Sequence, residues 1–212
     1  MLAGLPAFIV GNSPKLPVDD LDCLAGQFTI GVNRILVHGF TPTVLLWVDG
    51  SVYDDDHYGE MIDACDALLV CDKSVARNAK HHGLKTWVGD AALEHQATVT
   101  ELCVKGNTGC CAARWAIAIG CAPVYLVGME AVYDNGKTDS WGVNARHRPG
   151  STLMGMRHER ERLEREYPDK VFCVSGADLL REFAAESPDR DQDELRAEVG
   201  MMLMGFNPIE RK

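Results

Sequence analysis

The sequence predicts an α/β protein: a single Rossmann-like domain with a mostly parallel sheet covered by helices on both faces, plus a C-terminal amphipathic helix. Two observations predict this fold class. Short and almost continuously apolar runs alternate with helical stretches, a pattern typical of parallel strands buried on both faces. Polar clusters directly follow several of these runs, at the strand ends where ligands bind in such sheets. The chain of 212 residues is long enough for one such domain with an appendage.

The expected strands are the short apolar runs themselves. They cover residues 7–10, 28–32, 43–48, 67–71, 84–88, 124–128 and 171–174. The stretches between and after these runs predict helices. These helices cover residues 18–24, 51–64, 74–82, about 152–166 and a segment that begins at 177.

The most informative segment, residues 106–128, predicts a turn, a buried helix, a glycine stop and then a buried strand. Thr108 is the expected N-cap, and Gly120 stands where a helix ends in the left-handed conformation. The residues between them are small and apolar almost all round, which suits a helix packed on a sheet. Asn107, Thr108 and Gly109 place backbone N–H groups and a hydroxyl at the positive end of the helix dipole. The segment therefore predicts a phosphate-binding turn, with an ordinary capped core helix as the alternative.

The chain divides into a domain and a C-terminal appendage. Residues 1–184 form the expected nucleotide-binding α/β domain, with a lid-like loop at 129–150, and residues 185–212 form an acidic linker and an amphipathic helix. Ser187-Pro188 is the expected start of that helix. Its apolar residues recur at helical spacing and are Leu195, Val199, Met202, Leu203 and Phe206. This face is expected to pack on the domain or on a second subunit, which would give a homo-oligomer through the C-terminal helix.

Composition excludes several classes of function. The net charge is −10, with 31 acidic against 21 basic residues, whereas general nucleic-acid binding needs a basic surface. No apolar run reaches the ~18–20 residues that span a bilayer. The N-terminus lacks the features of a signal peptide, so we expect a cytoplasmic protein. The 8 cysteines include no C-x-x-C pair and mostly lie in apolar stretches, so we expect reduced core thiols rather than a metal site.

The first polar cluster, Gly11-Asn12-Ser13-Pro14, follows the first expected strand directly. Its glycine would let a ligand approach the backbone, while Asn12 and Ser13 offer an amide and a hydroxyl to a base, a ribose or a phosphate. The cluster is neither the G-x-G-x-x-G fingerprint of NAD sites nor a P-loop. Similar clusters follow other strands, at Asn33-Arg34, Asp49-Gly50, Asn107-Thr108-Gly109 and residues 130–135.

Four motifs follow one another along residues 7–183. They are Ile9-Val10-Gly11-Asn12-Ser13-Pro14-Lys15-Leu16, Gly31-Val32-Asn33-Arg34, Thr108-Gly109 at the start of an Ala-rich helix, and Val124-Tyr125-Leu126-Val127-Gly128-Met129-Glu130 with Tyr133-Asp134-Asn135-Gly136. In order and spacing they resemble the bacterial family-42 sialyltransferases. The resemblance implies a nucleotide-sugar-dependent glycosyltransferase that transfers a glycosyl group to an acceptor hydroxyl, favours a CMP-sugar donor and needs no metal. The acceptor itself is not indicated.

The resemblance also implies roles for individual residues. It places the cytidine nucleotide on Asn12, Asn33 and the Thr108-Gly109 turn. With their neighbours, the expected nucleotide-binding residues are Gly11, Asn12, Ser13, Asn33, Thr108 and Gly109. Tyr133 matches a tyrosine that contacts the leaving phosphate in that family.

A basic cluster at residues 144–150 carries the candidate general base. The resemblance implies a histidine base in this loop, and His147 is the candidate. Histidine's unperturbed pKa near 6.5 suits base chemistry at neutral pH. Arg146 and Arg148 flank it and would hold a phosphate or a carboxylate.

Two alternatives stay open. Residues 39–50 resemble the archaeal-type 6-hydroxymethylpterin pyrophosphokinases, in which an acidic residue after this strand lies near a Mg²⁺-bound nucleotide. Asp49 would then hold Mg²⁺, while the run Asp54–Asp56 either supplies further oxygen ligands or stabilises a helix start. The other alternative is a non-catalytic nucleotide-binding or assembly protein that keeps the fold.

The helix expected at 152–166 alternates arginine with glutamate. Pairs such as Glu161 and Arg165 stand four residues apart, where opposite charges attract on a helix surface. The pattern predicts a salt-bridged surface face.

Overall fold

The computed structural model describes residues 2–48, 52, 56–71, 107–137, 139–140 and 150–205. Its strands are β1 Ala7–Val10, β2 Thr29–Val32, β3 Val44–Trp47, β4 Leu68–Cys71, β5 Val124–Val127 and β6 Val171–Val174. Its helices are the 3₁₀ helices η1 Val18–Leu24 and η2 Ile35–His38, and the α-helices α1 Asp56–Ala64, α4 Thr108–Ala118, α5 Gly150–Glu166, α6 Ala177–Glu186 and α7 Gln192–Gly205. The elements expected at 74–82 and 84–88 lie outside the described residues.

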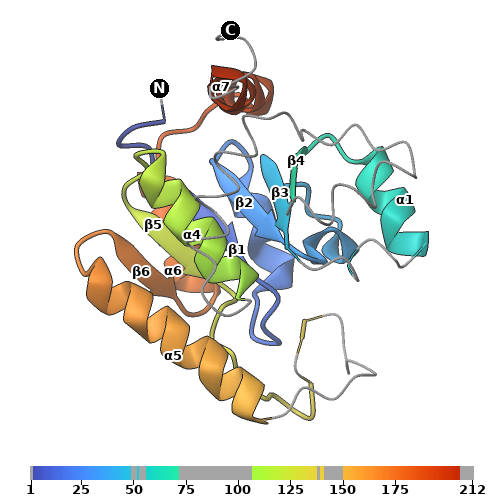
Figure 1. Cartoon of the computed structure of the whole chain (residues 1–212), viewed down its shortest axis with the longest axis vertical. Coiled ribbons are helices and arrows are strands. Elements are labelled where there is room, and N and C mark those ends of the chain that lie inside the picture. The colour runs from blue at the N-terminus through green and yellow to red at the C-terminus, as the bar shows by residue number, and fades with distance from the viewer. Residues whose placement is uncertain are drawn as a thin grey trace, which may run out of the picture.

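The six described strands form one parallel sheet in the order β4-β3-β2-β1-β5-β6 (Figure 1). In its register, Ile9 of β1 lies opposite Ile30 of β2 and Leu126 of β5. The chain runs from β1 outward to β4 and then returns to the other side of β1 for β5 and β6. The direction of winding therefore changes between β1 and β5, and the predicted Rossmann-like α/β fold is confirmed.

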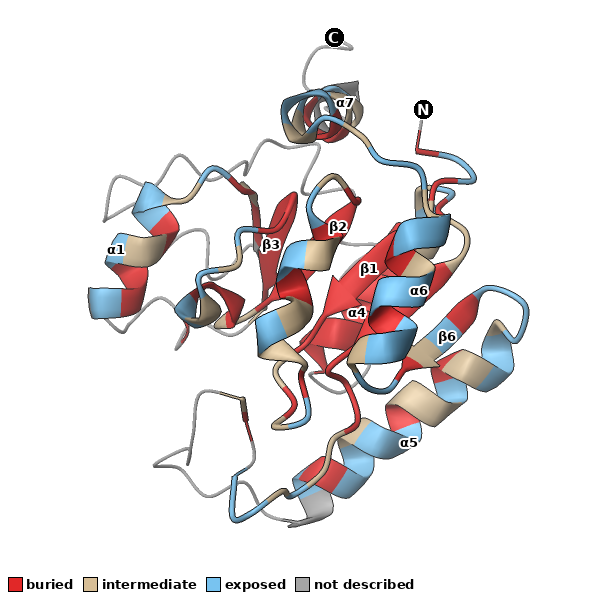
Figure 2. Ribbon diagram, turned by 180° about the vertical axis from the view of Figure 1, so that it is seen from behind, coloured by how far each residue is buried: buried red, intermediate tan, exposed pale blue. Residues whose placement is uncertain are grey.

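The two faces of the sheet bury alternate side chains of each strand. On one face, Ile9 and Leu126 pack with α4, with Leu163 of α5 and with Leu195 of α7. On the other face, residues such as Phe8 pack with η1, η2, α1 and α6. Figure 2 shows this second face, with α6 in front of the buried strands and its outer surface exposed. Helices thus cover both faces, as predicted.

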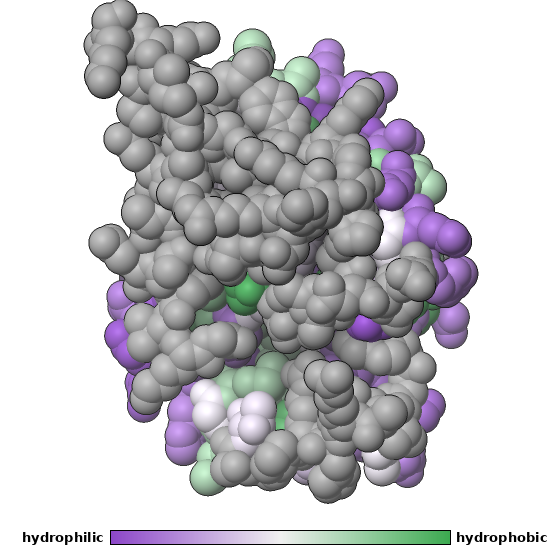
Figure 3. Space-filling view, turned by 45° about the vertical axis from the view of Figure 1, so that its right-hand side comes forward, coloured by the Kyte–Doolittle hydropathy of each residue, from purple (hydrophilic) through white to green (hydrophobic). Residues whose placement is uncertain are grey.

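Figure 3 shows hydrophilic residues on the described parts of one face of the molecule. In Figure 3 the purple residues lie along the sides of the molecule, and apolar atoms show in a hollow in the lower half of this view. The exposed large apolar side chains among the described residues are Val37, Tyr133, Met154, Phe172, Leu179 and Met201. No helix within the described ranges combines the length and the apolar character needed to cross a bilayer.

Helix α4 is buried along most of its length, as its small apolar sequence predicts. Every residue from Thr108 to Ala116 is buried. After the helix, Gly120 adopts a φ of +96°, which confirms it as the glycine stop. A Cβ at this position would lie 3.2 Å from the Cα of Ala3, so the stop also lets the N-terminal segment pack closely.

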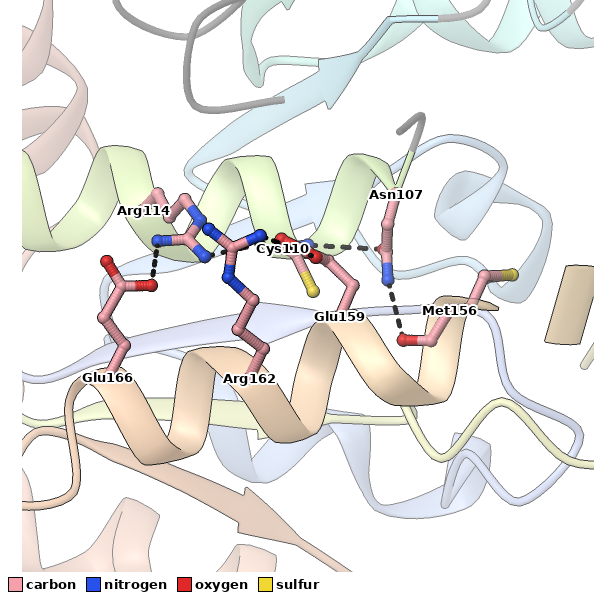
Figure 4. Close-up of polar contacts among 7 residues, drawn as sticks. All are labelled: Asn107, Cys110, Arg114, Met156, Glu159, Arg162 and Glu166. Atoms are coloured by element: carbon pink, nitrogen blue, oxygen red, sulfur yellow. Dashed lines mark hydrogen bonds and ion pairs between the residues drawn. The ribbon is translucent and has the colours of Figure 1, made fainter. Parts of the chain in front are cut away.

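One charged side chain, Arg114, lies within this apolar helix and joins α4 to α5 (Figure 4). Its Nη1 donates to Glu166 Oε2 at 2.8 Å, and its Nη2 lies 3.4 Å from Glu159 Oε1. Arg114 and Glu159 are both buried, and Arg162 lies 3.8 Å from the second oxygen of Glu159. The hydrogen bond from Arg114 lowers the pKa of Glu166. The buried charge is therefore compensated from α5, which fixes the register of the two helices.

The C-terminal helix α7 packs on the same domain. Leu195 and Val199 are fully buried in the core on the α4 side of the sheet. Gln192 Nε2 donates to Gln27 O at 2.8 Å, and its Oε1 accepts from Thr43 Oγ1 at 2.8 Å. Gln27 and Thr43 precede β2 and β3, so α7 lies at the amino edge of the sheet. Its apolar face is therefore used within the chain, while the oligomer stays a prediction.

Helix α7 begins later than predicted. The Oδ1 of Asp191 accepts from the N–H groups of Asp193 at 2.9 Å and Glu194 at 3.0 Å, which caps the helix. Ser187 instead ends α6, where its hydroxyl donates to Phe183 O at 2.8 Å. The expected start at Ser187-Pro188 is therefore wrong, because a second capping residue follows four positions later.

Replacing Arg114 should destabilise the fold strongly. Arg114→Met leaves the buried Glu159 carboxylate without its main partner, so the free energy of unfolding should fall by about 3 kcal/mol, measured by denaturant titration. Adding Glu159→Gln to this variant should recover part of the loss, because the uncompensated charge is removed. The control is Arg165→Met, an exposed arginine of α5, whose unfolding midpoint should match wild type. Equal unfolding midpoints for Arg114→Met and the control would show that the ion pairs of Arg114 do not stabilise the fold.

Candidate functional site

The candidate site lies at the carboxyl edge of the sheet, where β1 and β5 meet. Gly11-Asn12-Ser13 follows β1, Asn33 follows β2, and Gly128 to Glu130 follow β5. These strands are neighbours in the order β2-β1-β5. The fold therefore brings the predicted polar clusters of three strands to one edge, at the switch point where open α/β sheets bind ligands.

Gly11 is required at this edge by the packing of the protein itself. Its N–H donates to Val127 O at 2.8 Å, and the N–H of Ser13 donates to Gly128 O at 2.8 Å. A Cβ at position 11 would lie only 2.5 Å from Gly128 O. The glycine thus allows the β1 and β5 loops to meet, and its contact with a nucleotide stays a prediction.

Asn12 links two strand ends and presents a free acceptor. Its Nδ2 donates to Val32 O at 2.7 Å, which joins the end of β1 to the end of β2. Its Oδ1 is buried and has no hydrogen-bond partner among the described residues. A buried polar atom without a partner costs about 1–3 kcal/mol. A ligand N–H or O–H at this oxygen would remove that cost.

Asn33 presents a second acceptor of the same kind. It adopts a φ of +53°, a left-handed conformation that asparagine tolerates better than most residues. Its N–H donates to Leu46 O at 3.0 Å, and its carbonyl accepts from the hydroxyl of Tyr58. Burial raises the pKa of Tyr58, so this hydroxyl keeps its proton. The Oδ1 of Asn33 is buried without a partner in the described part of the chain.

Glu130 provides a third acceptor at the end of β5. The residue is buried, and its Oε2 has no hydrogen-bond partner within the described ranges. Sequence reasoning placed Glu130 in a polar cluster but not in the site. Together with Asn12 and Asn33, it gives each of three adjacent strand ends an acceptor that no described residue satisfies, which suits a ligand rich in N–H and O–H donors.

The N-cap of α4 is Asn107 rather than Thr108. The Oδ1 of Asn107 accepts from the N–H of Cys110 at 3.3 Å, and its Nδ2 donates to Met156 O of α5 at 3.3 Å (Figure 4). The expectation of Thr108 as the cap is therefore wrong, because asparagine caps at least as well and here also ties the helix start to α5. Thr108 and Gly109 form the buried first turn.

The chain after β5 returns to this edge through Ser140. The N–H of Ser140 donates to Asn12 O at 2.9 Å, and its Oγ lies 2.8 Å from His38 Nε2. Burial lowers the pKa of His38, which favours the neutral imidazole. His38 ends η2, 102 positions before Ser140, so no local sequence signal predicts this pair.

Several predicted site residues cannot be placed. His147, Arg146, Arg148 and Asp49 lie outside the described residues, so their roles stay predictions. Tyr133 is described and 43% exposed. Among the described residues there is no group of three or more His, Cys, Asp or Glu side chains suited to hold a metal ion.

The buried cysteines near the two ends of α4, Cys110 and Cys121, are poor nucleophiles. Burial raises the pKa of Cys110 and of Cys121 to about 12, so both stay protonated at neutral pH. The free thiols of the described residues are Cys23, Cys65, Cys110, Cys121 and Cys173. Cys111, however, is disulfide-bonded, so the expectation of reduced thiols throughout is wrong at this position. The spacing of the cysteines gave no sign of the bond.

The fold of the chain is similar to that of a solved sialyltransferase. The sialyltransferase CstII from Campylobacter jejuni, in complex with the substrate analogue cytidine-5′-monophosphate, aligns with a TM-score of 0.51 at 16% identity, over 85% of this chain and 84% of that chain. The fold is sialyltransferase-like. A CstII complex with CMP-3FNeuAc gives a TM-score of 0.45 at 16% identity, over 84% of this chain and 83% of that chain. No protein-family model matches the sequence, and no curated protein matches it.

Two glycine variants test whether a new methyl group at the candidate site would meet rigid backbone or a flexible side chain. Gly11→Ala should lower the free energy of unfolding by about 2 kcal/mol, because the new methyl meets the Gly128 carbonyl, which is backbone. At Gly109 a Cβ would meet the flexible end of Met129, with its Cε at 2.4 Å. Since Met129 can move and alanine favours a helix, Gly109→Ala should cost less than about 1 kcal/mol. Denaturant titration of both variants measures the difference, and the reverse order would refute this packing account.

Proposed function

We propose that this protein is a nucleotide-sugar-dependent glycosyltransferase that transfers a glycosyl group from a CMP-sugar to an acceptor hydroxyl. The observation that carries the proposal is the placement of Asn12 and Asn33 at neighbouring strand ends, where each has a buried side-chain oxygen with no hydrogen-bond partner among the described residues. These are the asparagines to which the sequence resemblance assigns the cytidine nucleotide. The sialyltransferase-like fold supports the same class of reaction.

The proposed nucleotide site uses acceptors at the strand ends and donors at α4. The Oδ1 atoms of Asn12 and Asn33 would accept from the amino group of the base or from ribose hydroxyls. The buried first turn at Thr108-Gly109 would hold the phosphate, because a helix N-terminus offers N–H groups and positive potential. Asn107 holds that turn in place through its cap and its bond to α5.

The proposed reaction needs one base and no metal. The acceptor oxygen forms a bond to the anomeric carbon of the donor, while the bond from that carbon to the phosphate oxygen breaks. The acceptor proton passes to the imidazole of His147, and CMP leaves with the bonding electron pair. In this proposal Arg146 and Arg148 contact the phosphate or an acidic group of the sugar, and Tyr133 contacts the leaving phosphate.

The first test measures the release of CMP from CMP-sialic acid by the purified chain, with and without a chelator. The proposal expects turnover that the chelator does not reduce. Turnover that requires Mg²⁺ and is lost in Asp49→Asn would favour the pyrophosphokinase alternative. Nucleotide binding without turnover on any donor would favour a non-catalytic role.

Removing the free acceptor of Asn33 should weaken nucleotide binding without harming the fold. Asn33→Gly keeps the left-handed backbone accessible and deletes the side chain, so the affinity for CMP should fall about tenfold, measured by isothermal titration calorimetry. The matched control is Asn135→Gly, since Asn135 also has a positive φ, of +48°, but is exposed on the loop after β5. Unchanged CMP binding in Asn33→Gly would place the nucleotide elsewhere.

The base can be tested separately from the nucleotide site. His147→Ala should lower turnover by about 10²–10⁴-fold with little change in CMP affinity, and the wild-type rate should fall on acidification because a protonated imidazole accepts no proton. His158→Ala is the control, because His158 is exposed on α5. If His38→Gln abolishes turnover while His147→Ala does not, the base is the imidazole beside Ser140 and the assignment of His147 is wrong.

A further inference from the structure

A shallow depression of about 240 Å³ lies between the loop after β5 and the first turns of α5. Its lining residues are Ala131, Val132, Tyr133, Leu153, Met154 and Arg157. Pockets for drug-sized ligands measure about 300–1,000 Å³, so this depression suits one ring or one charged group. Asn107 binds the carbonyl of Met156, the residue before Arg157, so the depression lies next to the start of α4.

Arg157 has no carboxylate partner among the described residues, a property that it shares with Arg165 but not with Arg160 or Arg162. Arg160 lies 3.8 Å from both Glu161 and Glu164, and Arg162 lies 3.8 Å from Glu159. Within the described ranges no acidic side chain lies at ion-pair distance from Arg157, which is exposed. The expectation of a salt-bridged face is therefore wrong at Arg157, whose guanidinium meets no described carboxylate. It is also wrong for the expected pair of Glu161 and Arg165, because Glu161 lies beside Arg160 instead.

The chemistry of the depression favours an anion carried on a ring. A guanidinium makes paired, charge-assisted hydrogen bonds to phosphate or carboxylate oxygens. The exposed ring of Tyr133 and the thioether side chain of Met154, 56% exposed, provide apolar surface beside it. In a chain with a net charge of −10, an anionic ligand needs such a local positive group.

We propose that Arg157 binds an anionic group at the reacting end of the nucleotide-sugar, either its phosphate or the carboxylate of an acidic sugar. The inference rests on the proposed function and assigns a residue that the sequence motifs do not include. If the group is the leaving phosphate, the guanidinium also stabilises the negative charge that develops there as the bond to the sugar breaks.

The test compares three ligands on the full-length chain by isothermal titration calorimetry: cytidine, CMP and a non-hydrolysable CMP-sialic acid analogue. In Arg157→Gln, the affinity for cytidine should match wild type, since cytidine has no anion. A fall of tenfold or more for CMP assigns Arg157 to the phosphate. A fall of the same size for the analogue with CMP unchanged assigns it to the carboxylate.

Two further variants control for charge and for folding. Arg165→Gln removes another exposed arginine of α5 that has no described carboxylate partner and does not line the depression, and it should bind all three ligands as wild type does. Arg157→Lys keeps the charge but loses the paired geometry, so its affinity should lie between wild type and Arg157→Gln. Wild-type affinities of Arg157→Gln for all three ligands overturn the inference alone. If the wild-type protein binds none of the three ligands, both the role of Arg157 and the proposed function are overturned.

Discussion

The buried guanidinium of Arg114 is the interaction on which the rest of this structure depends. It enters the apolar helix α4 and is matched by Glu159 and Glu166 of α5, which sets how the two helices lie against each other. Replacing such a network with apolar side chains often leaves stability unchanged, so stability alone does not explain it. What it provides is register: α4 carries the Thr108-Gly109 turn, and α5 carries Arg157.

A second constraint acts at the sheet edge. The β1 and β5 loops meet through two hydrogen bonds, and the contact needs glycine at position 11. The same edge leaves three side-chain oxygens, on Asn12, Asn33 and Glu130, buried without donors among the described residues. Close packing and buried acceptors without described partners thus occur side by side at this edge, and local conflicts of this kind are common at functional sites.

Much of the fold could be predicted because its signals are local. The β1 strand, the buried character of α4 and the glycine stop at Gly120 follow from short apolar runs and from one left-handed position. The helix starts were predicted wrongly where two good capping residues stand close together. Asn107, and not Thr108, caps α4, and Asp191, and not Ser187, caps α7.

The candidate site was predictable only as far as it follows strand ends. The sequence places Asn12 and Asn33 at one edge of the sheet, because the carboxyl ends of parallel strands share that edge; their contact with a nucleotide stays a prediction. The pairing of His38 with Ser140 could not be found, since it depends on a tertiary contact across 102 positions. The lone arginine in an apolar helix was a signal for the link between α4 and α5, because a buried charge requires a partner. The ion pairs of α5 were predicted correctly in part, but periodicity does not show that Arg157 and Arg165 lack a carboxylate partner among the described residues.

We propose that the cytidine nucleotide binds at the switch point between β1 and β5. A crystal structure of the protein with bound CMP would show this site. We expect the base and ribose at the oxygens of Asn12 and Asn33, with the phosphate toward the first turn of α4. CMP bound at the amino edge near α7, or no bound CMP at saturating concentration, would contradict it.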